Sequence, residues 1–216
     1  MLKLYHDPLS FNSRRVWVTL LEKELEFELI HLKLDQGEQL KPDFLAINPF
    51  HHIPTLVDDN FNVIESLAIL DYLDNKYPTP KMLPDNPQDL AIVRMVQATT
   101  ANELAPTMMS LAPVILDLPV KDAEKITRAE EKVSIVLKFF ENLLDDRDFF
   151  GSNTITLAEP VAGTIIPWLT KTNISLSDYP KLNAWCNRLL ARKAWQLTKE
   201  TPEAIADFKA RLGGNR

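Results

Sequence analysis

A cluster of four prolines divides this chain into two halves with different hydrophobic patterns. The stretch YPTPKMLPDNP contains Pro78, Pro80, Pro84 and Pro87. Each proline removes a backbone amide donor and disfavours helix in the residue before it, so no long helix or central strand can run through this stretch. We therefore predict a linker over residues 78–87, between a first domain at 1–77 and a second domain at 88–216.

The first half alternates strand and helix signals. Leu2 and Leu4 alternate with polar neighbours as in a short strand, and apolar residues at helical spacing follow over residues 14–23. The run FELIHL, residues 27–32, is typical of a second strand. These three segments predict a βαβ unit.

A further helix and a hairpin complete the first half. A helical segment around residues 41–46 precedes two apolar runs that flank Asp59-Asn60, a dipeptide suited to a tight hairpin turn. Residues 66–77 follow a helical pattern, and we expect Ser66 to cap that helix. The resulting order, βαβαββα, is thioredoxin-like.

The second half shows helical periodicity and no strand pattern. Its amphipathic stripe at helical spacing consists of Ile126, Ala129, Val133, Val136, Leu137, Phe140 and Leu144. We therefore predict an all-helical domain. Three prolines, Pro106, Pro113 and Pro119, should end or kink its first long helix, which predicts an irregular connection before about Asp122.

Composition excludes several classes of partner. The net charge is −6 and the 24 lysines and arginines are scattered, so no basic run indicates nucleic-acid binding. No segment approaches the roughly 20 apolar residues of a membrane span, and the N-terminus lacks a signal-peptide core, which favours the cytoplasm.

Cys186 is the only cysteine, and it lies on an apolar helical face typical of a buried structural thiol. The four histidines lack metal-site spacing, so we expect no metal.

Two motifs of the first half place polar groups at turns of the chain. In HDPLSFNSRRV, Ser10 or Ser13 stands at a helix entrance, where a short polar side chain can cap the helix or bond an anion held on its free amides. Ile53-Pro54 precedes the predicted hairpin, and proline is the residue that tolerates a cis peptide bond. A cis bond there would turn the preceding amide and carbonyl outward.

Two further motifs lie at helix starts. At Glu65-Ser66, a carboxylate and a helix-capping hydroxyl are complementary to the ammonium and carboxylate of an amino acid. Thr156 and Glu159 form a capping box, in which each side chain satisfies the backbone amide of the other. Pro160 falls in the first turn of that helix, where a missing amide costs little.

These motifs, in this order along the chain, resemble those of the cytosolic glutathione transferases. The resemblance covers nearly the whole chain, and HDPLSFNSRRVWVTLLEK and NPFHHIPTL are most similar to the phi class, with a looser likeness to theta, delta and zeta. It implies a thioredoxin-like glutathione-binding domain followed by an all-helical domain, in a cytoplasmic homodimer. The implied reaction is detoxification, in which glutathione thiolate attacks hydrophobic electrophiles; the same thiolate would also serve a peroxidase reaction.

The resemblance also implies roles for particular residues. Ser10 would activate the glutathione thiol, with Ser13 as the alternative because zeta-class enzymes carry a run of serines here. The residues implied in glutathione binding are Gln39, His52, Ile53, Pro54, Glu65 and Ser66. Leu40 replaces a usual basic residue and cannot donate a hydrogen bond, so the glycyl carboxylate would be held less firmly unless Lys41 compensates. The electrophile pocket would be lined by Leu9, Phe11, Met108, Met109 and Trp168.

Two alternatives to a conjugating transferase follow from the same motifs. A glutathione-dependent isomerase of the zeta type would need the serine run that Phe11 interrupts. A protein of the same fold that only binds ligands or partner proteins would be expected to lose the glutathione-binding motifs, whereas Pro54, Glu65 and Ser66 are all present. Conjugation is therefore the leading hypothesis.

Overall fold

The computed structural model describes residues 1–214, which form two compact units. One unit combines residues 1–81 with the segment from Lys193 onward, and the other spans residues 82–192. The domain boundaries expected from the sequence stay a prediction. Each unit is described by itself below.

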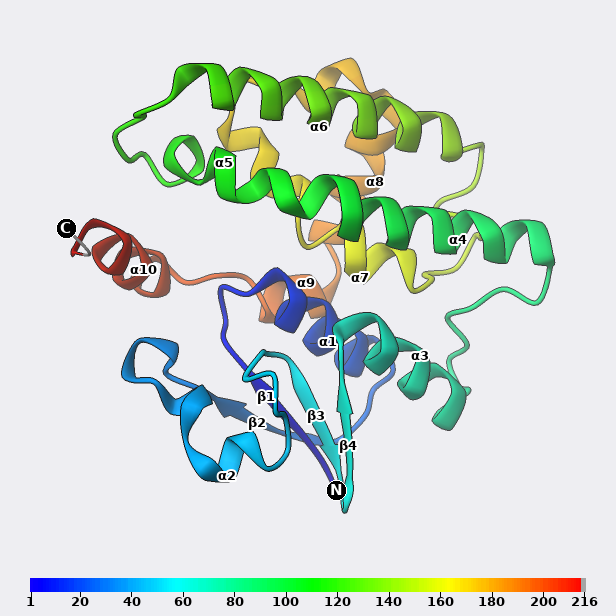
Figure 1. The fold of residues 1–216 in the computed structure, drawn as a ribbon. Helices are drawn as coiled ribbons and strands as arrows, with labels where there is room; N and C mark the ends of the chain where they lie inside the picture. Colours follow the sequence, from blue (N-terminus) through cyan, green and yellow to red (C-terminus); the bar gives the residue numbers. More distant parts are fainter. Residues whose placement is uncertain (215–216) are drawn as a thin grey trace. The chain divides into compact units, whose positions relative to one another are not determined.

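The N-terminal unit has the thioredoxin-like order that the sequence predicts. Its elements are β1 (Leu2–His6), α1 (Phe11–Glu22), β2 (Phe27–His31), the short helical turns η1 (Leu34–Gln36) and η2 (Glu38–Leu40), α2 (Pro42–Leu45), β3 (Thr55–Asp58), β4 (Phe61–Ile64) and α3 (Ser66–Lys76). The strands form one sheet in the order β2-β1-β3-β4, as Figure 1 shows. Strand β1 pairs parallel with β2 and antiparallel with β3, and β3 and β4 form the predicted hairpin.

Side-chain alternation along β1 assigns the helices to the two faces of this sheet. Successive side chains of a strand point to opposite faces. His6 contacts Trp17 of α1, with the ring centroids 5.2 Å apart, while Tyr5 contacts Phe44 of α2 at 5.7 Å. Helix α3 packs beside α1. The sheet is therefore covered by α1 and α3 on one face and by α2 on the other (Figure 1).

The segment from Lys193 onward joins the N-terminal unit through helix α1. It contains α9 (Lys193–Leu197), which packs against α1, and α10 (Pro202–Gly214). The Arg14 guanidinium forms an ion pair with Glu200 and donates a hydrogen bond to Thr198 Oγ1 at 3.3 Å. Both partners of the ion pair are almost fully buried, so the contact holds this segment firmly on α1.

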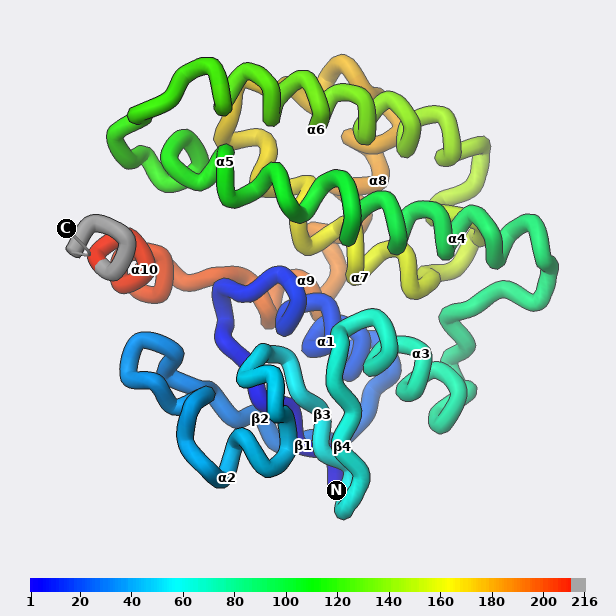
Figure 2. Tube along the Cα trace, viewed as in Figure 1, coloured from blue at the N-terminus to red at the C-terminus, as the bar shows by residue number. Residues whose placement is uncertain are grey.

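The second unit is helical throughout residues 82–192, as predicted. Its elements are α4 (Pro87–Thr99), the π-helical turn η3 (Thr100–Leu104), α5 (Ala105–Ile115), α6 (Ala123–Leu143), α7 (Ala158–Ala162), the 3₁₀ turns η4 (Ile166–Lys171) and η5 (Leu176–Asp178), and α8 (Pro180–Leu190). Figure 2 shows α6 running beside the continuous path of α4, η3 and α5. The predicted apolar stripe of α6 is buried. Within residues 1–214, no helix combines the length and apolar character needed to cross a bilayer.

The prolines of this unit act differently from the prediction. Pro106 and Pro113 do not end the helix, because α5 contains both of them and follows η3 without a break. The π turn widens the backbone directly before Pro106, where a missing amide and a bulky ring must be accommodated. The chain becomes irregular only after Ile115, and α6 begins after Asp122 as expected.

One half of the capping box predicted at Thr156 forms, and it continues into a buried network, while the cap position of α7 is Leu157. Glu159 accepts hydrogen bonds from the backbone amide and the hydroxyl of Thr156, both at 2.7 Å. Thr156 Oγ1 in turn accepts from the amide of Ala158 rather than from that of Glu159. Glu159 also accepts from the Phe150 amide at 2.9 Å and from Trp185 Nε1 at 3.3 Å. Burial raises the pKa of Glu159, and these donors oppose that rise.

The sequence also made predictions for two single side chains of this unit, Cys186 and Trp168. Cys186 is buried on α8, and burial raises the pKa of its thiol to about 12. Its environment is therefore that of the structural thiol expected from the sequence. Trp168 is buried on η4, with the Lys171 amine 4.0 Å from its ring centroid.

Truncating Glu159 should destabilise the protein more than truncating an exposed glutamate. Glu159→Ala leaves the amides of Phe150 and Thr156 and the indole of Trp185 without an acceptor in the core, so we expect the free energy of unfolding to fall by about 3 kcal/mol or more. The control is Glu124→Ala, which removes an exposed ion pair with Arg128 and should cost less than about 1 kcal/mol. Urea denaturation measures both, and equal losses would contradict the role given to Glu159.

His6 should make the stability of the protein depend on pH. Burial, with a smaller contribution from His31, lowers the pKa of His6 to about 4, below its ordinary value of 6.5. The unfolded chain therefore binds a proton more readily, and stability is lost as pH falls from about 6.5 to about 4. Over that interval the loss attributable to His6 is about 3 kcal/mol. His6→Phe keeps a ring against Trp17 and should show a shallower decline in urea titrations between these pH values; parallel declines would refute the assignment.

Candidate functional site

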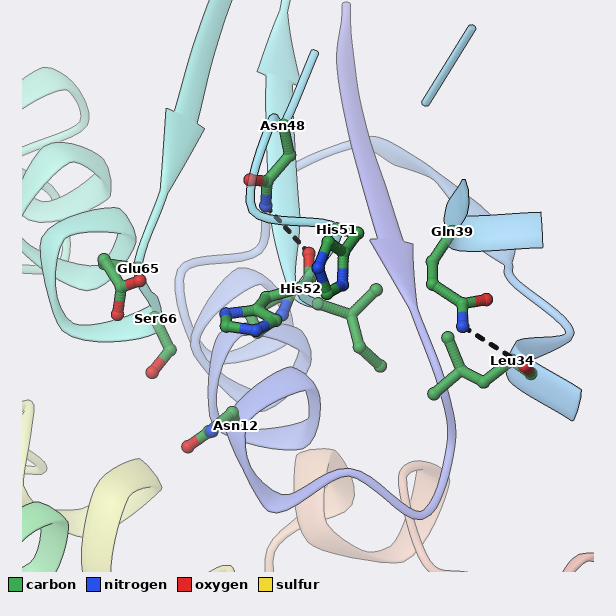
Figure 3. Close-up of a pocket in the computed structure, with 10 residues that line it drawn as sticks. Asn12, Leu34, Gln39, Asn48, His51, His52, Glu65 and Ser66 are labelled. Carbon is green, nitrogen blue, oxygen red and sulfur yellow. Dashed lines mark hydrogen bonds between the residues drawn. The ribbon is translucent and has the colours of Figure 1, made fainter. Parts of the chain in front are cut away.

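A cavity of about 410 Å³ lies at the end of the sheet formed by the N-terminal unit. Its lining residues are Asn12, Leu34, Gln39, Asn48, His51, His52, Ile53, Pro54, Glu65 and Ser66. These come from α1, the η1–η2 segment, the loop before β3 and the start of α3, as Figure 3 shows. All six residues that the sequence resemblance implies in glutathione binding therefore line one cavity.

The loop that ends at Pro54 is held by a single buried amide side chain. Asn48 Nδ2 donates to the His52 carbonyl at 2.8 Å and to Thr55 Oγ1 at 3.0 Å, while its oxygen accepts from the Phe50 amide at 3.0 Å. These bonds span the loop from one end to the other. The Ile53–Pro54 peptide bond is cis, and Pro54 is buried directly before β3.

The junction of β4 and α3 differs in detail from the expected cap. Ser66 is the first residue of α3, and Glu65 occupies the cap position with φ 66° and ψ 114°. A residue with a Cβ atom adopts positive φ only at an energetic cost, so the surrounding structure must enforce this conformation. The turn leaves the Glu65 side chain exposed, and it forms no capping hydrogen bond.

The polar groups at this junction have opposite characters. Within residues 1–214, no hydrogen bond or ion pair occupies the Glu65 carboxylate. Ser66 is buried, with 8% of its surface exposed, and its hydroxyl lies at the first turn of an eleven-residue helix. Free amides at a helix start favour an anion, whereas an unpaired carboxylate favours a cation. Adjacent positions therefore suit the two charged groups of an amino acid.

The two candidate serines lie in different environments. Ser10 caps α1, because its Oγ accepts a hydrogen bond from the Ser13 amide at 3.2 Å, and its side chain is partly exposed. Ser13 is fully buried, and its hydroxyl has no hydrogen-bond partner among the residues described. Neither serine lines the cavity, although Asn12 between them does. Ser10 is the serine that a ligand can reach.

The remaining predicted residues stand outside the cavity. Leu40 is 55% exposed, and the Lys41 amine pairs with Glu38 at 3.0 Å instead of reaching a lining position. The residues expected to form the electrophile pocket divide between the two units: Leu9 and Phe11 are partly exposed beside the start of α1, Met108 is buried on α5, Met109 is 73% exposed and Trp168 is buried. Their joint role stays a prediction.

Four lining residues were not assigned a ligand-binding role from the sequence. Asn48 belongs to an Asn-Pro pair, a turn signal that could have indicated its role in fixing the loop. Asn12 lies inside the HDPLSFNSRRV motif, and Leu34 is the first residue of η1. His51 stacks edge-on with His52, with their ring centroids 5.3 Å apart. In the described part of the chain, no three His, Cys, Asp or Glu side chains converge as metal ligands would.

Both halves of the chain match known protein families. Residues 4–81 match the model described as the N-terminal domain of glutathione S-transferase, and residues 100–193 match the corresponding C-terminal domain. A glutathione S-transferase from Hyoscyamus muticus is 31% identical over 202 residues, which cover 90% of this chain and 95% of the relative. Glutathione S-transferase F10 from Arabidopsis thaliana is 30% identical, with 91% of this chain and 95% of the relative covered.

A solved structure agrees with these sequence relatives. Glutathione transferase F2 from Populus trichocarpa superposes with a TM-score of 0.79 at 26% identity, covering 97% of this chain and 100% of that chain. The Arabidopsis and Populus proteins belong to the phi class, which the motifs of this sequence most resemble. Since both domain models match in the expected order and relatives align over nine tenths of the sequence, the chain belongs to the glutathione S-transferase family.

Proposed function

We propose that this protein binds glutathione in the cavity of its N-terminal unit and transfers the glutathione thiolate to hydrophobic electrophiles. The observation that carries the proposal is the convergence of Gln39, His52, Ile53, Pro54, Glu65 and Ser66 on one cavity. The Glu65 carboxylate would bind the ammonium of the γ-glutamyl group, and Ser66 with the amides of α3 would bind its carboxylate. The backbone beside Pro54 would pair with the cysteinyl part of glutathione.

Ser10 is the residue we assign to thiol activation. Its oxygen already accepts the capping hydrogen bond from Ser13, but a hydroxyl has one donor and two acceptor sites. Within residues 1–214, its hydrogen has no acceptor, so it remains available to a thiolate. The start of α1 adds the positive end of a helix dipole. Both effects favour the thiolate over the thiol, which is the form that attacks electrophiles.

We also propose that the protein acts as a cytoplasmic homodimer and can reduce peroxides with the same thiolate. The reducing compartment is supported by a single cysteine that is buried rather than paired. Family membership supports the dimer and the peroxidase reaction. Light scattering should give about twice the mass of one chain, 24.7 kDa, and a monomer would contradict the proposed assembly.

Replacing Ser10 should raise the pKa of bound glutathione. We expect Ser10→Ala to reduce conjugation of a nitroaryl chloride at pH 6.5 by about tenfold or more, because the thiol pKa returns toward its free value of about 8.5. The loss should shrink as pH approaches 9, where the thiol ionises without help. Ser10→Ala should also cost about 1 kcal/mol of stability through the lost cap.

Ser13→Ala is the matched control for this experiment. It removes a buried hydroxyl three residues away and should keep both the rate and its pH profile. If Ser13→Ala loses activity while Ser10→Ala keeps it, the assignment of Ser10 is wrong. If the wild type neither binds glutathione-agarose nor turns over the nitroaryl chloride, the proposed enzymatic function is refuted. If it binds glutathione-agarose but turns over none of several electrophiles, a non-catalytic binding protein is favoured.

Glu65 should contribute to binding and at the same time carry backbone strain. Glu65→Ala and Glu65→Gly both remove the carboxylate, so both should weaken glutathione binding by about tenfold. Glycine tolerates positive φ better than alanine, so the glycine variant should be the more stable of the two by about 1 kcal/mol. Isothermal titration and urea denaturation measure the two effects, and undiminished binding by both variants would disprove the role of the carboxylate.

A further inference from the structure

Arg15 is one of the largest fully buried side chains of the protein. It lies on α1 with 2% of its surface exposed. Burial lowers the pKa of its guanidinium to about 10, so the group still carries its positive charge at neutral pH. A buried cation is costly unless an anion or a full set of hydrogen bonds compensates it.

The neighbouring buried cations of α1 have such compensation, and Arg15 does not. Arg14 pairs with Glu200, and Lys23 donates to Asp74 and to the Pro80 carbonyl, both at 2.7 Å. For Arg15 the structure of residues 1–214 provides one hydrogen bond, from Nη1 to Ser66 Oγ at 3.4 Å. Within the same residues, its Nε and Nη2 atoms are buried without any partner. No carboxylate there forms an ion pair with it, so the fold leaves this charge uncompensated.

The contact with Ser66 fixes which way the serine hydroxyl is polarised. A guanidinium can only donate hydrogen bonds, so the Ser66 oxygen must act as the acceptor toward Arg15. Its hydrogen is then free to be donated elsewhere, and Ser66 lines the cavity. The first amides of α3 and the Arg15 charge both favour an anion at that position. Glu65, on the other side of the same junction, favours a cation.

We propose that Arg15 is a positioning residue for the α-carboxylate of the γ-glutamyl group, acting through Ser66 from behind the cavity. It holds the Ser66 hydroxyl as a donor toward the ligand and supplies the positive charge that the ligand carboxylate neutralises. Together with Glu65 it sets the orientation of the zwitterion, with the carboxylate toward Ser66 and the ammonium toward Glu65. This inference rests on the proposed binding of glutathione.

Comparing the affinities for three peptides distinguishes a positioning role of Arg15 from a contribution to packing alone. Glutathione carries both charged groups at its γ-glutamyl end, 4-aminobutyryl-cysteinylglycine lacks only the α-carboxylate, and glutaryl-cysteinylglycine lacks only the ammonium. The affinities of wild type, Arg15→Met and Arg15→Lys for each peptide are measured by isothermal titration. The control is Lys23→Met, which also removes a buried cation of α1, but one whose partners lie within the protein.

Arg15→Met should weaken binding of glutathione and of the glutaryl peptide by about tenfold to a hundredfold, the range for a hydrogen-bonded charge. Its affinity for the 4-aminobutyryl peptide should change by less than about twofold, because that peptide has no carboxylate to hold. Arg15→Lys keeps the charge without the planar fork, and should lose about twofold to tenfold for the same two peptides. Lys23→Met should leave the ratio of affinities for glutathione and the 4-aminobutyryl peptide unchanged.

If the Arg15 variants lose the same factor in affinity for all three peptides, Arg15 contributes only packing and the proposal is overturned. If circular dichroism shows that Arg15→Met does not fold, Arg15→Lys decides, and its failure to discriminate the 4-aminobutyryl peptide overturns the proposal as well. A wild type that does not bind glutathione would refute the proposed function, and this inference with it. A wild type that binds glutathione, combined with Arg15 variants that do not discriminate among the peptides, would refute the inference alone.

Discussion

The N-terminal unit depends on helix α1 and on the basic side chains that it buries. Arg14 attaches the segment around Glu200, Lys23 attaches the end of α3 through Asp74, and Arg15 reaches the start of α3 at Ser66. A buried charge that loses its partner costs about 3–5 kcal/mol, so these contacts specify their partners more strictly than apolar packing would. One helix thereby sets the positions of α3 and of the C-terminal segment relative to the sheet.

Hydrogen bonds within the protein hold the loop of the cavity, whereas several polar groups at and near the cavity have no protein partner in the part of the chain that the structure describes. Its loop is fixed by the three hydrogen bonds of the Asn48 side chain. By contrast, within residues 1–214 the Glu65 carboxylate that lines the cavity has no hydrogen-bond or ion-pair partner. Outside the lining, and within the same residues, the Ser10 hydroxyl hydrogen and two nitrogen atoms of Arg15 also lack partners. A binding site needs little rearrangement to bind a ligand when protein hydrogen bonds already hold its loop in place and the polar groups that would face the ligand have no protein partner.

Sequence periodicity predicted most of this fold because the underlying rules are local. Alternation identified β1, the Asp59-Asn60 turn identified the hairpin, and the apolar stripe identified α6. The path of the chain at Pro106 could not be predicted in this way, since an isolated proline signals a helix end and only the whole helix shows the compensating π turn. The positive φ of Glu65 places the cap position at Glu65 instead of Ser66. It could not be predicted either, because positive φ is usually signalled by glycine or asparagine and this residue is neither.

The candidate site was predictable to the extent that its residues belong to motifs. The resemblance named six lining residues. Asn48 bonds to residues of its own loop, and Arg15 bonds to Ser66, which is 51 residues away; both contacts appear only in the folded structure. For Ser10, the cap uses an acceptor site of the hydroxyl oxygen, so the hydroxyl hydrogen stays available for the proposed activation of the thiol.

The burial of Cys186 on α8 has a consequence for the thiol chemistry of the chain itself. The thiol is buried on α8, and burial raises its pKa to about 12, which disfavours the thiolate at neutral pH. In thiol–disulfide exchange a thiolate attacks a sulfur of the disulfide and the other sulfur leaves as a thiolate, so the buried Cys186 is a poor nucleophile toward oxidised glutathione while the chain is folded. We therefore expect Cys186, the only cysteine of the sequence, to form mixed disulfides when the helical unit unfolds and not while it is folded.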